Sequence, residues 1–584
     1  MAGSAFMNSG VTNLDLSKAT KLITIQPASF QGCASLSTIT LPNSVTTIGN
    51  QAFQGTTSLS SLTVPNSLTS IGDRAFLASG LTSLDLSSTQ VTTIGQGAFA
   101  NTAKLETLKV PGTLTTLNSG SSTSGDAVTA TFSGSGITEL DLSNTKITQI
   151  AESTFSGATK LASVTLPAGL TSIGSSAFQN ATSLSTITLP NSLTTIGNNA
   201  FQGSGLTSID LSNTKITTIA ESTFDTASKL ASVNLPATVT SISQRAFNST
   251  SSLKTLTQVA PATPGRYANS VAKEGQGATL SSAITSIGQQ AFASTGLTSI
   301  DLSAMTVTSL NSNNIFQNAG SLSSVNLPKT LTSIPTGFFL SCASLSTVTL
   351  PGSITSIGNQ AFQGSGLTSL DLSQTQVRTI GSDAFNGATK LATLKLPTTG
   401  LTSIGDRAFQ GAFTGDSALK TLPLPSSVTS IGQSAFQSSG LTSIDLANTQ
   451  VTTIQNSTFN GAAKLATVKL PAGVTSIGNK AFYGTTALKT LTQQSAPSTL
   501  DTPGVGDREA IGQEERSTTT PTKNKLTSSI TTISTRAFQG TGLEQIDLSD
   551  VQVTTSLGNS VFQQATNLSN LELPSGLTTI PAGM

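Results

Sequence analysis

The sequence predicts a repeat solenoid of about 22 short coils that stack on one another and share one elongated interior. Three observations support this fold class. A phenylalanine recurs every 23 or 24 residues along most of the 584-residue chain, from Phe6 to Phe562. Each repeat contains apolar and polar residues that alternate as they do in a short strand. Charged residues make up 9% of the chain against a typical value of about 25%, which is unusual for globular domains.

The first element of each coil is a strand with the pattern L-x-x-[IL]-x-[LV], as in Leu184, Ile187 and Leu189. Its period of two predicts one buried side and one exposed side. A proline such as Pro190 usually follows and ends the strand, because proline has no N–H to donate. We expect these strands to pair in parallel from coil to coil on the concave face of the solenoid.

A second apolar pair, such as Leu193 and Ile196, predicts a second short strand on the convex side. The segment G-x-x-A-F-x-G that follows predicts a tight turn or a single helical turn, with its Phe filling the interior. Since no coil can bury its apolar side chains alone, neighbouring coils must share a core.

One coil type, which recurs mostly every third coil, replaces the L-P ending with D-L and carries an Asp column. Strand spacing places successive members of this column about 14 Å apart, too far to share one calcium ion. In the coil after an Asp, the same column often holds Lys, which predicts cross-strand ion pairs. We interpret the column as a stabilising ladder, with ligand binding as the alternative. Its candidate residues are Asp85, Lys109, Asp210, Asp371, Lys395, Asp445 and Lys469.

The chain is predicted to be one solenoid domain, residues 1–584, interrupted by insertions at about 118–131, 258–283, 412–415 and 492–529. Insertions in a solenoid leave the stack as loops, often on a binding face. The second and fourth insertions concentrate charge in a chain that otherwise has little. We expect either contact loops or flexible excursions without a partner. The candidate ligand-contact residues are Arg266, Tyr267, Lys273, Glu274, Arg508, Glu509, Arg516 and Lys523.

The repeat resembles the BspA-like class of leucine-rich repeats, with its L-P, I-G-x-x-A-F and cysteine columns. Cys33 and Cys342 occupy the cysteine column in F-x-x-C-A-S-L. The resemblance covers nearly the whole chain and implies a leucine-rich-repeat superhelix. It also implies a surface or secreted protein that adheres to host or matrix proteins rather than a catalyst.

Composition excludes several classes of function. The chain has no histidine, which removes histidine-ligated metals and histidine-based catalytic triads. The net charge of +1 gives no field that favours nucleic acid. No apolar run approaches the length of a membrane-spanning helix, and residues 1–10 lack the features of a secretion signal. We therefore expect no enzyme activity, no cofactor, no nucleic-acid partner and no membrane insertion in this segment.

The leading hypothesis is a non-catalytic binding protein whose partners are proteins, contacted through the concave sheet and the inserted loops. The alternative is a structural stalk or a self-assembling repeat segment, because uncapped sheet edges favour end-to-end association. A remoter alternative is binding to ice or another crystalline surface through the Thr-Thr-Ile columns. The sequence names no catalytic, cofactor-binding or metal-binding residue.

Overall fold

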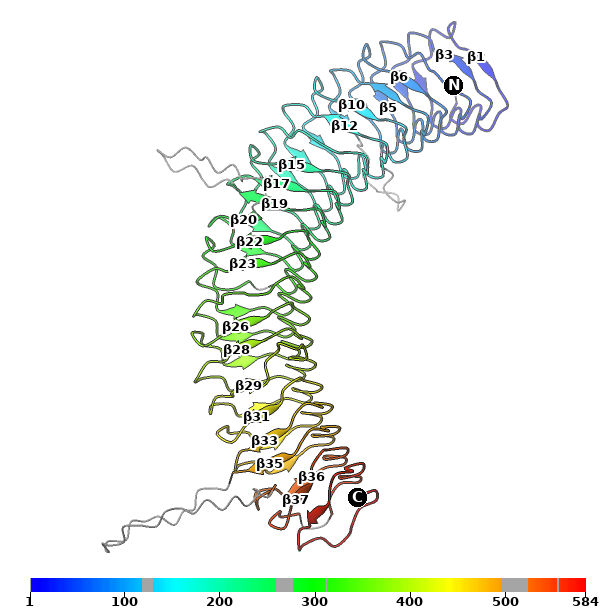
Figure 1. The fold of residues 1–584 in the computed structure, drawn as a ribbon. Helices are drawn as coiled ribbons and strands as arrows, with labels where there is room; N and C mark the ends of the chain where they lie inside the picture. The colour runs from blue at the N-terminus through cyan, green and yellow to red at the C-terminus, as the bar shows by residue number, and fades with distance from the viewer. Residues whose placement is uncertain (1, 118–129, 259–276, 311, 495–523, 554–555) are drawn as a thin grey trace, which may run out of the picture. The chain divides into compact units, whose positions relative to one another are not determined.

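The computed structural model describes residues 2–117, 130–258, 277–310, 312–494, 524–553 and 556–584. Contacts divide the chain into two compact units, unit 1 (Met1–Pro328) and unit 2 (Lys329–Met584). Each unit is a solenoid of short parallel strands joined by turns (Figure 1), which confirms the predicted fold class. The described residues contain no helix, so the segment around each Phe is a turn. The expectation of a single domain over 1–584 stays a prediction.

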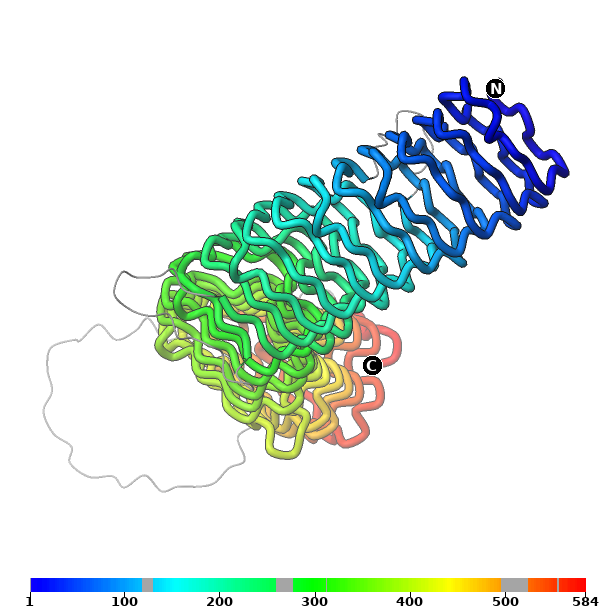
Figure 2. The backbone as a smooth tube through the Cα atoms, turned by 90° about the horizontal axis from the view of Figure 1, so that it is seen from above, coloured from blue at the N-terminus to red at the C-terminus, as the bar shows by residue number. Residues whose placement is uncertain are grey.

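Every coil contributes to two strand faces and one turn edge. We call the sheets formed mainly by three- and four-residue strands the first face, and those of the remaining two-residue strands the second face. The turn edge consists of the turns around the repeating Phe. Figure 2 shows these coils following one another within unit 1, from blue to green.

In unit 1 the first face contains β1 (Asn13–Asp15), β3 (Thr38–Thr40), β6 (Ser83–Asp85), β8 (Thr107–Lys109), β10 (Glu139–Asp141), β12 (Ser163–Thr165), β15 (Ser208–Asp210), β17 (Ser232–Leu235), β19 (Thr255–Gln258), β20 (Ala278–Thr279), β22 (Ser299–Asp301) and β23 (Ser324–Asn326). Its second face contains β2 (Thr24–Ile25), β4 (Thr47–Ile48), β5 (Ser70–Ile71), β7 (Thr93–Ile94), β9 (Thr116–Leu117), β11 (Gln149–Ile150), β13 (Ser172–Ile173), β14 (Thr195–Ile196), β16 (Thr218–Ile219), β18 (Ser241–Ile242) and β21 (Ser286–Ile287).

In unit 2 the first face contains β26 (Ser369–Asp371), β28 (Thr393–Lys395), β31 (Ser443–Asp445), β33 (Thr467–Leu470), β35 (Thr490–Gln493), β37 (Gln545–Asp547) and β38 (Asn570–Glu572). Its second face contains β24 (Ser333–Ile334), β25 (Ser356–Ile357), β27 (Thr379–Ile380), β29 (Ser403–Ile404), β30 (Ser430–Ile431), β32 (Thr453–Ile454), β34 (Ser476–Ile477) and β36 (Thr532–Ile533).

The core of each unit is a stack of phenylalanine rings. In unit 1 the rings from Phe6 to Phe316 follow one another at centroid distances of 5.0–5.8 Å and are within 12° of parallel. In unit 2 the rings from Phe339 to Phe562 are spaced at 5.3–5.7 Å. Each ring therefore packs on the rings of the coils before and after it, as the Phe period predicted.

Backbone conformation at the turn edge follows the same period. Gln51 and Gly55, two residues before and after Phe53, both have positive φ, 58° and 71°. These two left-handed residues reverse the chain around the ring. They also aim the Phe53 N–H at the carbonyl of Ala75 in the next coil, 2.7 Å away. The turn edge is thus a third hydrogen-bonded ladder beside the two strand faces.

Threonine hydroxyls support the second face. The hydroxyl of Thr69 donates to the carbonyl of Thr46 in the preceding coil at 2.9 Å, and Thr194 and Thr355 make the same bond with Thr171 and Thr332. These hydroxyl groups therefore donate their hydrogen bonds to the backbone of the preceding coil. Cys33 and Cys342 are buried free thiols in different units.

The coil type that carries Asp contains a glycine in the connection between its Phe and its strand. The chain from the Phe to the next strand is one residue shorter in this coil, so it passes close to the preceding coil. The Gly205 N–H donates to the Ala181 carbonyl at 3.0 Å, and a Cβ on Gly205 would lie 2.1 Å from the Thr182 carbonyl oxygen. Real Cβ contacts are never this short, so the shortened connection requires glycine.

We predict that Gly205→Ala destabilises its coil by about 2–3 kcal/mol, because the new methyl group forces two backbones apart. Gly169→Ala is the matched control, since a Cβ on Gly169 meets no atom within 4 Å. Native-state hydrogen exchange on both variants measures the local effect. Equal exchange rates in the two variants would contradict the close approach at Gly205.

Candidate functional site

The exposed side of the first face is made of small hydroxyl residues and one column of charge. Outward residues of its strands are mostly Ser and Thr, such as Thr38 and Thr40 of β3, while the residue between them, Ile39, is buried. The last outward position holds the predicted Asp and Lys residues in some of these strands and Thr or Asn in others. A surface of this kind offers polar contacts and no deep apolar cleft.

Each Asp of the column closes the turn that follows its strand. A carboxylate oxygen accepts a hydrogen bond from the backbone N–H two residues later, at 2.9 Å for Asp210 and Ser212 and at 3.0 Å for Asp445 and Ala447. This is the local bond by which Asp stabilises a turn. The Asp column therefore has a structural role even where no Lys faces it.

The structure places the predicted Asp and Lys residues opposite each other in three pairs. The Lys Nζ lies 3.4 Å from the carboxylate in Asp85–Lys109, and 3.0 Å from it in both Asp371–Lys395 and Asp445–Lys469. Asp210 instead faces Asn234. Because the paired side chains are 50–64% exposed, each pair contributes less than about 1 kcal/mol to stability. The three pairs help to hold adjacent strands in register.

The same contacts lower the pKa of the Asp side chains. Hydrogen bonds from the hydroxyl and N–H of Ser373, followed by one from Lys395, lower the pKa of Asp371 from 3.8 to about 2. The serine two residues later is also the main cause of the lowered pKa of Asp15, Asp85 and Asp141. These carboxylates are therefore charged acceptors over a wide pH range.

The second and fourth insertions leave the solenoid at equivalent points. Both follow the hexapeptide LKTLTQ, residues 253–258 and 488–493, which forms β19 and β35. The chain returns to the first face as β20 in one case and as a bridge between Lys525 and Asp547 in the other. The second face runs on directly, since β18 pairs with β21 and β34 pairs with β36. Each insertion thus adds a strand position to the first face alone.

A buried glutamine closes each of these two exits. Gln258 is 7% exposed, and its Nε2 donates to the Val239 carbonyl at 2.8 Å. Its Oε1 accepts from the N–H and the hydroxyl of Ser281 at 3.0 and 2.8 Å, on the returning chain. Leu235 fills the corresponding position in the preceding coil. The amide therefore satisfies backbone groups that the insertion would leave unpaired.

Gln493 makes the equivalent contacts in unit 2. Its Nε2 donates to the carbonyl of Val474 at 3.2 Å, and its Oε1 accepts from the N–H of Thr527 at 2.9 Å. We call Gln258 and Gln493, with these partners, the glutamine clasps. Asn524 extends the second clasp, because its side-chain amide bonds Leu491 N–H and Lys489 C=O as a peptide group of a neighbouring strand would.

The other two insertions lie elsewhere on the coil. Residues 130–131 rejoin unit 1 between β9 and the turn of Phe132, so the first insertion does not follow a first-face strand. In the third insertion Ala412 and Phe413 are buried, and Phe413 stacks on Phe409 at 5.6 Å. This short insertion is therefore packed into its coil and is not a protruding loop. The eight candidate contact residues, Arg266, Tyr267, Lys273, Glu274, Arg508, Glu509, Arg516 and Lys523, lie outside the described residues.

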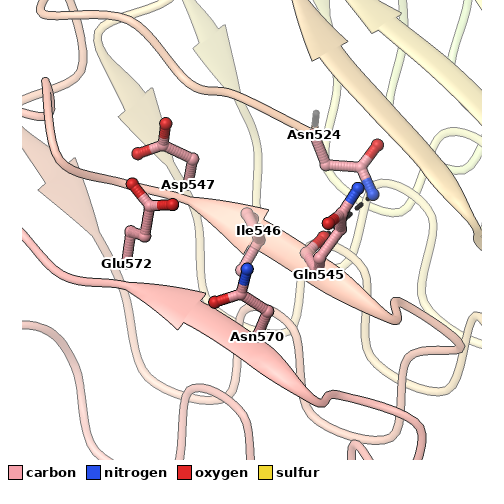
Figure 3. A pocket seen from close by; sticks show the side chains of 6 residues that line it. All are labelled: Asn524, Gln545, Ile546, Asp547, Asn570 and Glu572. Carbon is pink, nitrogen blue, oxygen red and sulfur yellow. Dashed lines mark hydrogen bonds between the residues drawn. The ribbon is translucent and has the colours of Figure 1, made fainter. Parts of the chain in front are cut away.

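A small cavity on the first face lies between β37, β38 and Asn524 (Figure 3). The carboxylates of Asp547 and Glu572 stand next to each other there, on directly paired residues. Asp547 is 6% exposed, accepts hydrogen bonds from the N–H and hydroxyl of Ser549, and lies 3.7 Å from Lys525. Among the described residues no group of three His, Cys, Asp or Glu side chains is arranged to hold a metal ion.

Two ion pairs with a buried carboxylate lie on the turn edge and were not predicted from the sequence. Asp225, 1% exposed, accepts from Arg245 at 3.0 Å and from Asn248 at 2.7 Å. Asp383 is held by both Nε and a terminal nitrogen of Arg407, at 2.9 and 2.8 Å. A charged residue next to, or two before, a stacking Phe was the available signal. In both pairs the carboxylate is neutralised by an arginine of the same chain.

Comparison with known proteins gives one family. A family model described as a BspA type leucine rich repeat region matches six segments, residues 1–123, 148–263, 265–314, 309–412, 410–502 and 511–584. No curated protein matches the chain. In the described part of the chain no helix is long and apolar enough to cross a membrane.

Several solved structures are similar in fold. A leucine-rich repeat protein from Bacteroides ovatus is 21% identical, with a TM-score of 0.31, over 81% of this chain and 82% of that one. A leucine rich cell surface protein from Faecalibacterium prausnitzii is 19% identical, with a TM-score of 0.31, over 76% and 88%. A leucine-rich repeat protein from Eubacterium ventriosum is 21% identical, with a TM-score of 0.28, over 59% and 81%.

We predict that Gln493→Leu destabilises the second exit by about 1–3 kcal/mol, because leucine fills the space but leaves the Thr527 N–H without its acceptor. The exposed neighbour provides the control variant, Gln494→Leu, which should have little effect. Hydrogen exchange at Thr527 and Leu491 reports the change. Unchanged protection in Gln493→Leu would show that the clasp does not hold the exit.

We also predict that Ser373→Ala raises the pKa of Asp371 more than Lys395→Gln does, because the serine hydroxyl is the larger cause of the lowered value. The first variant should fold, since Ala447 already follows Asp445 in the same turn. Since the folded pKa is depressed, the stabilising contribution of Asp371 is present above pH 3.8. It is lost as the pH falls from about 4 to about 2. Carboxyl-detected NMR titration measures both values, and the reverse order would refute the assignment.

Proposed function

Because the chain belongs to the BspA-type leucine-rich repeat family, we propose that it is a non-catalytic surface or secreted protein that binds host or matrix proteins. The observation that carries this proposal is the pair of glutamine clasps. Each clasp completes the hydrogen bonding of the solenoid on both sides of an insertion. The solenoid can therefore present long segments without relying on them for its own stability.

The charge distribution supports different roles for the solenoid and for its insertions. Asp85, Asp371 and Asp445 on the first face are paired with lysines. The insertion that follows each clasp glutamine contains charged residues that are not part of the Asp and Lys column. Among them are Arg266, Lys273, Arg508 and Arg516. We propose that these segments supply specificity and that the hydroxyl-rich first face adds weaker polar contacts.

The chemistry of the described residues supports a binding role over a catalytic one. The chain has no histidine, and the buried carboxylates of Asp225 and Asp383 are neutralised by arginines. The exposed Asp residues of the first face close turns. Catalysis by a carboxylate needs a group that is free to donate or accept a proton near substrate.

The test is a double deletion of residues 259–276 and 495–523, each replaced by a Gly/Ser linker long enough to run from the end of one parallel strand to the start of the next, that keeps both clasp glutamines. We predict an unchanged far-UV circular dichroism spectrum and at least tenfold weaker binding to immobilised extracellular matrix proteins, measured by biolayer interferometry. Deletion of residues 118–129 is the matched control, because this segment lies between β9 and the turn of Phe132 in the chain and does not follow a first-face strand.

The outcomes separate the parts of the proposal. Absence of binding by the intact chain to every matrix protein in the panel would refute the adhesion function. Equal binding by the intact and doubly deleted chains would refute the role of the insertions. Concentration-dependent assembly in sedimentation velocity, without matrix binding, would favour the alternative of a self-assembling structural segment.

A further inference from the structure

The turn edge of unit 2 carries two cations, Lys480 and Arg536, that form no ion pair with a described carboxylate, unlike Arg245 and Arg407 in the same column. The residue two before the stacking Phe is basic at five positions of the column, Arg74, Arg245, Arg407, Lys480 and Arg536. Arg245 and Arg407 each bind a carboxylate of the preceding coil, Asp225 and Asp383. In these two pairs a carboxylate of the same chain neutralises the cation.

Lys480 and Arg536 lie on adjacent coils. The Lys480 N–H donates to the Thr535 carbonyl at 3.1 Å, and Phe482 stacks on Phe538 at 5.4 Å. Neither cation forms an ion pair with a carboxylate among the described residues. The turn segments 454–463, 477–487, 533–543 and 557–567 contain no Asp or Glu. Two like charges therefore face the same region of surface without an acidic neighbour in these turns.

Both cations line one open hollow. Its other lining residues include Asn479, Thr535, Asn559 and Ser560, whose amides and hydroxyls are hydrogen-bond donors. Lys480 is half-buried, and its Nζ lies 5.8 Å from the ring centroid of Tyr483. A tyrosine face attracts the ammonium group but leaves its net charge in place.

We propose that this hollow binds a tetrahedral oxyanion, a sulfate or phosphate group. The planar guanidinium of Arg536 offers two parallel donors, the Lys480 ammonium offers a point charge, and the neutral donors complete a shell around the oxygen atoms. An anion here also removes the repulsion between the two cations. The site lies on the turn edge and the exits lie on the first face, so the hollow uses none of the clasp residues.

Tyr483 provides a direct probe, because the chain has no tryptophan and only two tyrosines. In a Tyr267→Phe background, the tyrosine fluorescence comes from Tyr483 alone. Titration with sodium sulfate, at ionic strength held constant with sodium chloride, should give a saturable change with a dissociation constant on the order of millimolar. Inorganic phosphate should bind within a few-fold of sulfate, and acetate at least tenfold more weakly.

Variants connect the response to the two cations. Lys480→Gln with Arg536→Gln should weaken sulfate binding at least tenfold, and the exposed Arg536→Gln alone at least threefold. The matched control is Lys395→Gln with Lys469→Gln, which removes the same charge from the first face and should leave binding unchanged. A response equal to that of chloride, equal binding of acetate, or an equal loss in the control pair would each overturn the proposal.

Discussion

The stacking of phenylalanine rings between neighbouring coils is the interaction on which the rest of the structure depends. A single coil has too few residues to surround a ring, so Phe201 is buried only because Phe178 and Phe224 lie on either side. Burial of this kind couples each coil to its nearest neighbours and to no distant one. The strand faces, the turn edge and the glycine at each shortened coil all keep the spacing that the rings require.

Hydrogen bonding sets the second constraint, because every interruption of the repeat exposes backbone groups inside the stack. The chain meets this constraint with side-chain amides. Gln258 and Gln493 replace a leucine and pair the groups on both sides of an insertion, and Asn524 acts as an additional peptide unit. The same solution occurs at both exits from the first face.

Charge is scarce in this protein and is largely used for internal purposes. Asp371 closes a turn and pairs with Lys395, and the buried carboxylate of Asp225 neutralises Arg245. This internal use is the reason that Lys480 and Arg536 stand out at the turn edge. Their turns contain no acidic residue, whereas Arg245 and Arg407, at equivalent positions, each bind a carboxylate.

The sequence by itself determined the repeat, the order of strand, strand and turn in each coil, and the pairing of Asp85 with Lys109. These features depend on period and on register, which residue spacing records directly. The sequence also located the insertions, although it did not indicate that Phe413 packs into its coil. Only the tertiary structure decided the roles of Gln258, Asn524 and Arg536. Their contacts are formed by residues about 20 to 55 positions apart along the chain, whose side-chain directions depend on how successive coils are stacked.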